Sequence, residues 1–71
     1  MSKVIRIGLL GVGKMGQNHL RNLIMLKQVE IAFIYDFDKN ICEQMSKLHN
    51  VPISRNLDED LQKVDGVVIV T

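Results

Sequence analysis

Three glycines near the amino terminus have the spacing of a phosphate-binding turn. Gly11, Gly13 and Gly16 form a G-x-G-x-x-G run that directly follows an apolar segment and directly precedes a helical one. A strand that turns sharply into a helix leaves the first N–H groups of the helix unpaired, and the positive end of the helix dipole faces the turn. Both features attract a pyrophosphate group. The run therefore predicts a dinucleotide site, although a glycine-rich turn without a ligand has the same pattern.

Each position of this run predicts a separate role. Gly11 allows the tight turn out of the strand, Gly13 lets the backbone approach the pyrophosphate, and Gly16 lets the helix pack closely on the strands. The N–H groups around Lys14 and Met15 are then the expected pyrophosphate donors. The side chain of Met15 is expected either to pack near the dinucleotide or to fill a gap in the core.

An acidic residue at the end of the second apolar run strengthens this prediction. Asp36 follows Gly16 by about 20 residues, where a carboxylate can accept hydrogen bonds from both hydroxyls of the adenosine ribose. It would repel a 2′-phosphate, and neither Phe37 nor Asp38 is a cation that could replace it. We therefore expect NAD, while Lys39 keeps NADP open as an alternative. FAD-binding sheets share both features, and a solvated strand end is the alternative without a ligand.

Other ligand classes fit less well. The stretch before the glycines, residues 6–10, lacks the acid that S-adenosylmethionine-dependent methyltransferases usually carry there. The G-x-x-x-x-G-K-[S/T] loop is also missing, because Gln17 and Asn18 follow Gly16. Nine basic and eight acidic residues are scattered along the 71-residue chain without a basic stripe, and aromatic residues are few. Nucleic acid is therefore not an expected partner.

The compartment is predicted from what the sequence lacks. Cys42 is the only cysteine, so no intrachain disulfide can form, which is typical of a reducing compartment. The first apolar run is too short for a signal peptide, because Arg6 interrupts it and Gly8 ends it. No segment approaches the length of a membrane span. We therefore expect a cytoplasmic protein.

Three further side chains have reactive chemistry that packing can explain. His19 lies on the flank of the first expected helix, where a packed or capping side chain is a stronger expectation than an acid–base group. His49 at a helix end is expected to face the negative end of a dipole, and Cys42 on an apolar helical face is expected in the core. Neither a catalytic residue nor a metal site is predicted within this chain.

Hydrophobic periodicity predicts the elements that position these residues. Strands are expected at residues 4–10, 29–35, 51–53 and 67–71, and helices at residues 14–27, 38–49 and 56–62. Asp38 and Asn56 are expected to cap the second and third helices, and Pro52 places its short strand at or near a sheet edge. This β-α-β-α-β-α-β order predicts an α/β fold with a parallel sheet, the first half of a doubly wound, Rossmann-like domain.

Together these segments resemble the amino-terminal region of the glucose–fructose oxidoreductase/inositol dehydrogenase (Gfo/Idh/MocA) family. The matching pieces are residues 5–8, 11–16, 19, 35–38, 56–58 and 65–71. In that family the last of these strands usually ends in Thr-Pro and its threonine lines the cofactor, a position that Thr71 matches. The resemblance implies an NAD-dependent oxidoreductase that transfers hydride to or from a sugar, a polyol or a similar small molecule.

The resemblance also implies that residues 1–71 are a partial Rossmann domain, inactive alone. In the family, a Glu-Lys-Pro motif and later Asp and His residues serve the substrate, and a second domain follows; none of these lies in this sequence. The strand at 67–71 would then have a bare apolar edge, which favours pairing with a second copy. The alternative function is a non-catalytic nucleotide-sensing or assembly module that uses the same half-fold.

Overall fold

Strands and helices alternate along the chain and build one parallel sheet. The computed structural model describes residues 3–70. The elements are β1 (Ile5–Leu10), α1 (Lys14–Ile24), β2 (Val29–Tyr35), α2 (Lys39–His49), α3 (Leu57–Leu61) and β3 (Gly66–Ile69). The strand order is β2-β1-β3, and both pairings are parallel. The expected Rossmann-like α/β half-fold is confirmed.

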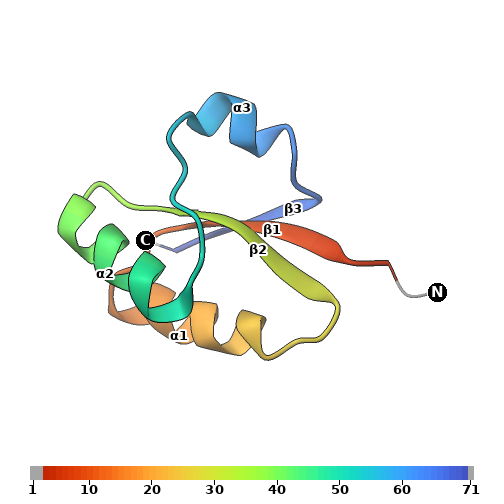
Figure 1. Cartoon of the computed structure of the whole chain (residues 1–71), viewed down its shortest axis with the longest axis horizontal. Coiled ribbons are helices and arrows are strands. Elements are labelled where there is room, and N and C mark those ends of the chain that lie inside the picture. The colour runs from red at the N-terminus through yellow and green to blue at the C-terminus, as the bar shows by residue number, and fades with distance from the viewer. Residues whose placement is uncertain (1–2, 71) are drawn as a thin grey trace.

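The elements lie in layers, with the core on one side of the sheet. Helices α1 and α2 cover one face, and α3 lies on the other side (Figure 1). The core forms between the sheet and the first two helices, where Leu9, Leu20 and Ile34 are fully buried and Met45 of α2 packs against them. These four side chains come from β1, α1, β2 and α2, so burying them fixes the four elements relative to one another.

The first helix ends earlier than expected. It stops at Ile24, so Lys27 lies outside it and Arg21 is the basic residue of its last turn. The reason is a long-range bond: the N–H of Ile5 donates to the carbonyl of Gln28 at 2.7 Å. This bond ties the start of β2 to the start of β1, so the chain must leave the helix before residue 27.

The segment at 51–53 forms a single bridge where a short strand was expected. Ile53 pairs with Ile34, whose N–H donates to the carbonyl of Pro52 and whose carbonyl accepts from Ser54, both at 2.9 Å. The expected position at a sheet edge is confirmed, because the bridge lies on the side of β2 away from β1. The next bond back along this ladder would need an N–H at residue 52, which proline lacks, so the pairing stops there.

Both predicted helix caps are present. The carboxylate of Asp38 accepts hydrogen bonds from the N–H groups of Asn40 and Ile41 at 3.0 and 3.2 Å, at the start of α2. The side-chain oxygen of Asn56 accepts from the N–H of Glu59 at 3.2 Å, at the start of α3. Each cap satisfies backbone donors that a helix start otherwise leaves free.

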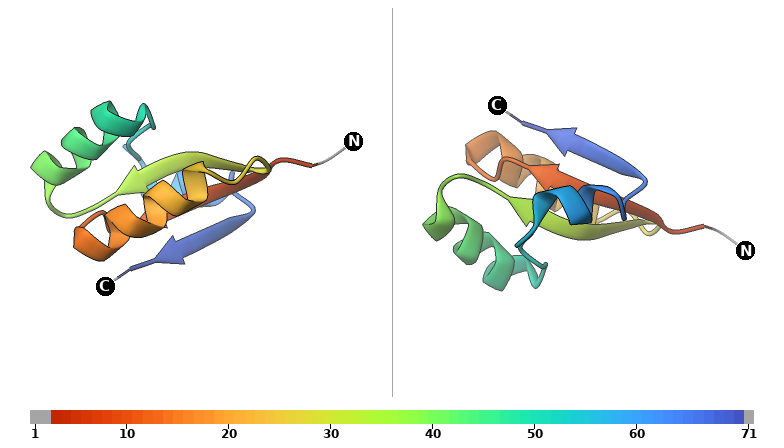
Figure 2. Two further views of the ribbon diagram at one scale, coloured as in Figure 1. Left: turned by 90° about the horizontal axis from the view of Figure 1, so that it is seen from below. Right: turned by 90° about the horizontal axis from the view of Figure 1, so that it is seen from above.

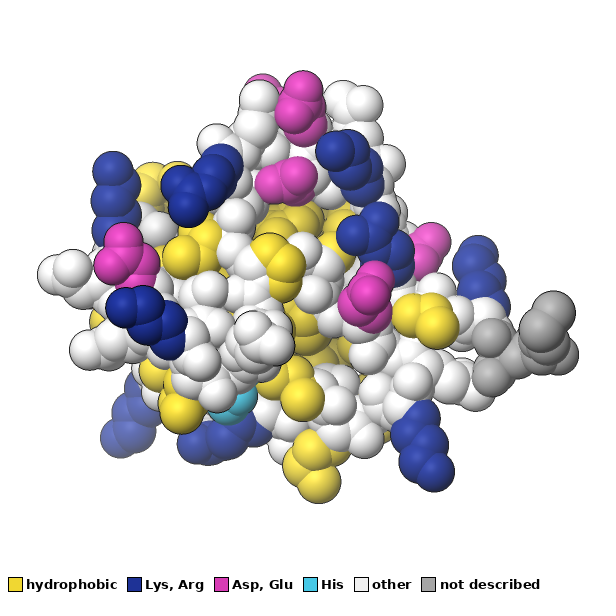
Figure 3. Space-filling view, in the orientation of Figure 1, with side chains coloured by type: hydrophobic (Ala, Val, Ile, Leu, Met, Phe, Trp, Pro, Cys, Tyr) yellow, Lys and Arg dark blue, Asp and Glu magenta, His cyan; other side chains and the backbone are white. Residues whose placement is uncertain are grey.

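The last strand is less buried than an interior strand. β3 alternates between half-buried and exposed residues, with Val67 38% and Ile69 69% exposed. Within residues 3–70 it pairs only with β1. On the face seen in Figure 3, side chains of both charges surround exposed apolar ones, without a stripe of a single sign. No helix in the described part of the chain is long and apolar enough to cross a membrane.

Candidate functional site

The carboxyl ends of the three strands meet the first turns of α1 and α2 at one edge of the sheet (Figure 2). β1 runs into the glycine turn, β2 runs into Asp36, and β3 runs into Val70, whose N–H donates to the carbonyl of Leu10 at 2.8 Å. In open α/β sheets, ligands bind outside this edge. The predicted cofactor-binding residues within residues 3–70 therefore gather where such a sheet binds its ligand.

Gly11 makes the tight turn that its position predicts. Its φ of 104° lies in the left-handed region, and its N–H donates to the carbonyl of Tyr35 at 2.8 Å. A Cβ at this position would lie 3.2 Å from the carbonyl carbon of Val70 and closer still to the oxygen. Conformation and space both require glycine here.

Gly13 leaves the start of α1 open. It is the N-cap residue in an extended conformation, it supplies no side-chain cap, and no atom lies within 4 Å of where its Cβ would be. The first helical bond runs from the N–H of Gln17 to the carbonyl of Gly13 at 2.8 Å. Within residues 3–70, the N–H groups of Lys14, Met15 and Gly16 therefore have no hydrogen-bond acceptor. This helix start suits the oxygens of an anion.

The structure refines what was expected for the packing at Gly16 and for the side chain of Met15. Gly16 is buried, but its close neighbour is the backbone of Gly11, because a Cβ at Gly16 would lie 2.6 Å from the carbonyl carbon of Gly11. The helix therefore packs tightly on the turn, where tight packing on the strands was expected. The side chain of Met15 is 63% exposed, so it does not fill a gap in the core.

Asp36 accepts a hydrogen bond from the glycine turn, a contact that its position in the sequence does not reveal. One carboxylate oxygen accepts a hydrogen bond from the N–H of Val12, and the other accepts from the N–H of Asp38, both at 2.8 Å. The residue is half-buried at the end of β2. Each carboxylate oxygen can accept more than one hydrogen bond, so capacity remains for a ligand hydroxyl.

A pocket of 560 Å³ opens beside Asp36, between the end of β2 and the segment after the Ile53 bridge. Its lining residues are Tyr35, Asp36, Phe37, Lys39, Cys42, Glu43, Ile53, Ser54 and Arg55. The ring of Phe37 is 93% exposed and meets Tyr35 edge to face, with 6.0 Å between ring centroids. An aromatic surface, two carboxylates and two cations therefore surround one opening, whose volume is in the range of small-molecule sites.

Arg55 is a pocket residue that sequence reasoning missed. It lies two residues after the short strand predicted at residues 51–53, and the pairing of Ile53 with Ile34 brings it to the pocket that Lys39 also lines. The arginine adds a second cation near Asp36. A signal was present in the sequence, since a basic residue two positions after an edge segment lies at the same edge of the sheet.

The cysteine at the pocket wall belongs to the core, as expected. Cys42 is 3% exposed, and its thiol lies 4.0 Å from the carbonyl of Ile34. Burial raises the pKa of this thiol above its ordinary value; the backbone of Asp36 opposes the shift, and the charges of Asp36 and Glu43 add to it. A buried thiol with a raised pKa is a poor nucleophile.

The remaining predicted residues lie apart from this pocket or outside the description. His19 is exposed on α1 and lines neither pocket described here. His49 is the last residue of α2, at the helix end that was expected. Thr71 lies outside the described residues. Within residues 3–70, no group of three or more His, Cys, Asp or Glu side chains is placed to hold a metal ion.

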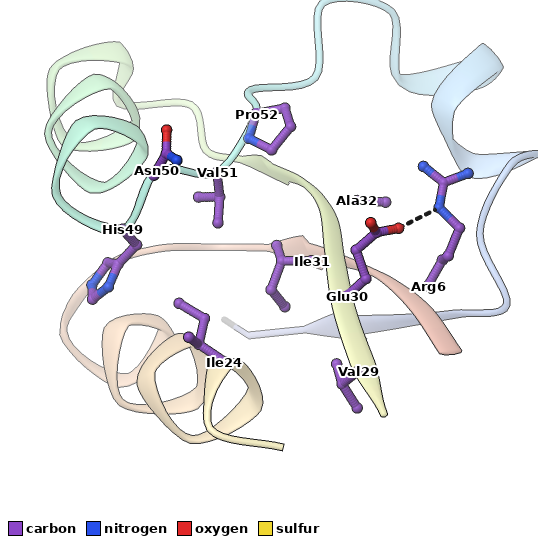
Figure 4. Close-up of a pocket in the computed structure, with 10 residues that line it drawn as sticks. All are labelled: Arg6, Ile24, Val29, Glu30, Ile31, Ala32, His49, Asn50, Val51 and Pro52. Atoms are coloured by element: carbon purple, nitrogen blue, oxygen red, sulfur yellow. Dashed lines mark hydrogen bonds and ion pairs between the residues drawn. The ribbon is translucent and has the colours of Figure 1, made fainter. Parts of the chain in front are cut away.

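A smaller pocket of 360 Å³ lies toward the other end of the sheet (Figure 4). It is lined by the first half of β2, by His49 and Asn50 at the end of α2, and by an ion pair between Arg6 and Glu30 at 3.0 Å. Both partners of the pair are about half exposed, so the pair contributes little to stability. This pocket is separate from the glycine turn and from Asp36.

Comparisons with known proteins agree with this geometry. The model of an oxidoreductase family with an NAD-binding Rossmann fold matches residues 5–71. Among solved structures, GenD2 from gentamicin A biosynthesis, in complex with NAD, is 25% identical with a TM-score of 0.87 over 100% of this chain. UDP-N-acetylglucosamine 3-dehydrogenase GnnA from Acidithiobacillus ferrooxidans is 25% identical with a TM-score of 0.83 over 96% of this chain. A comparison with curated protein sequences gives no match.

A third similar structure supports the fold alone. Apo scyllo-inositol dehydrogenase from Lactobacillus casei is 23% identical, with a TM-score of 0.85 over 100% of this chain. This chain spans 21%, 22% and 22% of the lengths of the three solved chains, in the order given. The family match covers nearly every residue, and the fold agrees with it. The chain therefore belongs to the Gfo/Idh/MocA oxidoreductase family, as a Rossmann-fold segment of the NAD-binding type.

Proposed function

We propose that this chain binds NAD across the carboxyl edge of its sheet. The open N–H groups of Lys14, Met15 and Gly16 would bind the pyrophosphate, because the described chain offers them no acceptor and Gly13 leaves the approach clear. Asp36 would accept hydrogen bonds from the adenosine ribose. This helix start, with its free donors facing outward, is the observation that carries the proposal.

The pocket beside Asp36 would hold the adenosine half of the cofactor. Its volume of 560 Å³ and the exposed ring of Phe37 suit a nucleoside. Gly11 would keep the turn tight beneath the pyrophosphate. Thr71, by resemblance to the family, would lie near the nicotinamide half. The cofactor supplies the hydride chemistry, and the residues named here bind and orient it.

The whole protein is proposed to be an oxidoreductase acting on a sugar, a polyol or a similar hydroxyl or carbonyl compound. Support comes from the oxidoreductase family match and from the relatives, which include a UDP-N-acetylglucosamine 3-dehydrogenase. This chain spans about a fifth of their length, so the substrate-binding and catalytic residues are proposed to lie in further sequence. On this proposal residues 1–71 are a partial Rossmann domain that binds cofactor without turnover.

Two further features complete the proposal. The exposed apolar residues of β3, Val67 and Ile69, would lie at an interface with a second copy of the chain, since an unpaired strand edge favours pairing.

The lone buried thiol of Cys42 suits a reducing compartment, which favours the cytoplasm.

Comparing the affinities of the chain for NADH and NADPH tests the cofactor proposal. We expect NADH to bind more tightly, because the carboxylate of Asp36 would repel a 2′-phosphate. Lys39 and Arg55 oppose this preference, so the double variant Lys39→Gln/Arg55→Gln should increase it. Tighter binding of NADPH by the wild-type chain would overturn the assignment.

A further inference from the structure

The carboxylate of Asp36 connects two elements that are distant in sequence. Its Oδ2 atom accepts the N–H of Val12, which lies between Gly11 and Gly13, and its Oδ1 atom accepts the N–H of Asp38. The side chain of Val12 is fully buried. The carboxylate at the end of β2 therefore binds the middle of the turn that follows β1.

This bond holds a segment that would otherwise be mobile. Glycine loses more conformational freedom on folding than any other residue, and Val12 has a glycine on each side. The N–H of Gly11 donates to the carbonyl of Tyr35 and the N–H of Val12 donates to Asp36, each at 2.8 Å. Two consecutive turn residues are thus bonded to two consecutive residues at the end of β2. The hydrogen bond to Asp36 is the stronger of the two, because its acceptor is a carboxylate and not a backbone carbonyl.

The glycine turn also sets the direction of the free N–H groups at the start of α1. Gly13 follows Val12 directly and is the N-cap of α1, so the conformation at residues 11 and 12 determines where the first N–H groups of the helix point. A carboxylate can accept about four hydrogen bonds, and donors within residues 3–70 use two of them. The same group can therefore hold the turn and accept bonds from a ribose at once.

We propose that Asp36 is a positioning residue for the pyrophosphate site, in addition to a ribose acceptor. The inference rests on the proposed function, and it adds that Asp36 acts on a group that it does not touch. Removing the carboxylate would then weaken binding of the pyrophosphate as well as binding of the ribose. A residue that only recognised the ribose would leave pyrophosphate binding unchanged.

The test combines amide hydrogen exchange with binding of inorganic pyrophosphate and NADH by the full chain. In Asp36→Ala, exchange of the Val12 amide should be about tenfold faster or more relative to that of Leu9 in β1, since a bond to an ionised acceptor is lost. Pyrophosphate should bind several-fold more weakly. The matched control is Asp65→Ala, which removes a carboxylate bond of 2.9 Å to the N–H of Arg6 at the other end of the sheet. It should change neither quantity.

The outcomes separate this inference from the proposed function. If Asp36→Ala weakens NADH binding but leaves pyrophosphate affinity and Val12 exchange unchanged, the positioning role is wrong and the ribose role remains. If the wild-type chain binds neither probe, the proposed function fails and the positioning role fails with it; faster Val12 exchange in Asp36→Ala would then show only that the carboxylate holds the turn. Should Asp36→Ala fail to fold, Asp36→Leu replaces it, because its branched side chain is close in shape to that of Asp and has no hydrogen-bond acceptor for either N–H donor. An unchanged Val12 exchange rate in that variant would also overturn the inference.

Discussion

At the scale of single residues, the glycines of the turn differ in what a side chain would meet. At Gly11 a Cβ would meet the carbonyl of Val70 in a left-handed conformation, whereas at Gly13 it would meet nothing within 4 Å. Gly11 is thus required by the fold, and Gly13 is required only if something approaches the helix start from outside. On the proposed function, this contrast separates a structural glycine from a glycine that leaves room for the cofactor.

Paired alanine substitutions test that contrast. Gly11→Ala should lower the free energy of unfolding by about 1–3 kcal/mol, because the backbone is strained for any residue with a side chain. Gly13→Ala should change it by less than about 0.5 kcal/mol and yet weaken NADH binding, because a methyl group would lie in the path of the pyrophosphate. Urea unfolding and NADH titration measure the two effects. Equal loss of stability in both variants would contradict the assignment.

The buried thiol of Cys42 gives the fold a predictable dependence on pH. Burial raises its pKa in the folded chain, so folding favours the neutral thiol. The corresponding stability is full below the unfolded pKa of about 8.5 and is lost as the pH rises toward the folded value. The difference in unfolding free energy between wild type and Cys42→Ala should therefore narrow between about pH 7 and about pH 10. Urea unfolding at both pH values checks this, and a constant difference would contradict it.

At the scale of elements, local patterns predict the strands and caps better than the ends set by distant contacts. The apolar run of β2 and the caps at Asp38 and Asn56 depend on neighbouring residues, and the structure agrees with them. The predicted end of α1 was wrong because the hydrogen bond from the N–H of Ile5 to the carbonyl of Gln28 sets it, and these two residues are distant in sequence. The hydrogen bond from the N–H of Val12 to Asp36 is also long-range, and spacing alone does not reveal it. Arg55 reaches the pocket through the bridge between Ile53 and Ile34, for which its place after the edge segment was a signal.

The outer edge of β3 carries a prediction about association. Pairing with a second copy through this edge would make the sedimentation coefficient of the chain rise with concentration. Ile69→Lys should abolish the rise, because it places a charge on the 69%-exposed side chain of the edge strand. Leu48→Lys is the matched control, since Leu48 is also 69% exposed but lies on α2. A wild-type chain that stays monomeric at every concentration, or an equal effect of both variants, would contradict the proposal.

At the scale of the whole molecule, the proposed cofactor site depends on the parallel arrangement of the three strands. Parallel strands bring the glycine turn, Asp36 and the end of β3 to one edge, while the ion pair of Arg6 and Glu30 lies toward the other. Each strand thus leads into one part of the edge at which we propose that NAD binds, although these parts are dispersed along the sequence. The same fold occurs in solved chains about five times as long, and we propose that this segment forms the cofactor side of a larger enzyme.

The central claim, that the glycine turn and Asp36 together bind the dinucleotide, is tested most directly by following backbone amide resonances during titration with NAD. The largest and saturable shifts should occur at residues 11–16 and 36–38, because the free helix donors and the strand end would meet the pyrophosphate and ribose. Shifts centred on residues 29–32 and 49–51, which line the pocket toward the other end of the sheet, would contradict the account. So would a folded chain whose resonances do not move at all.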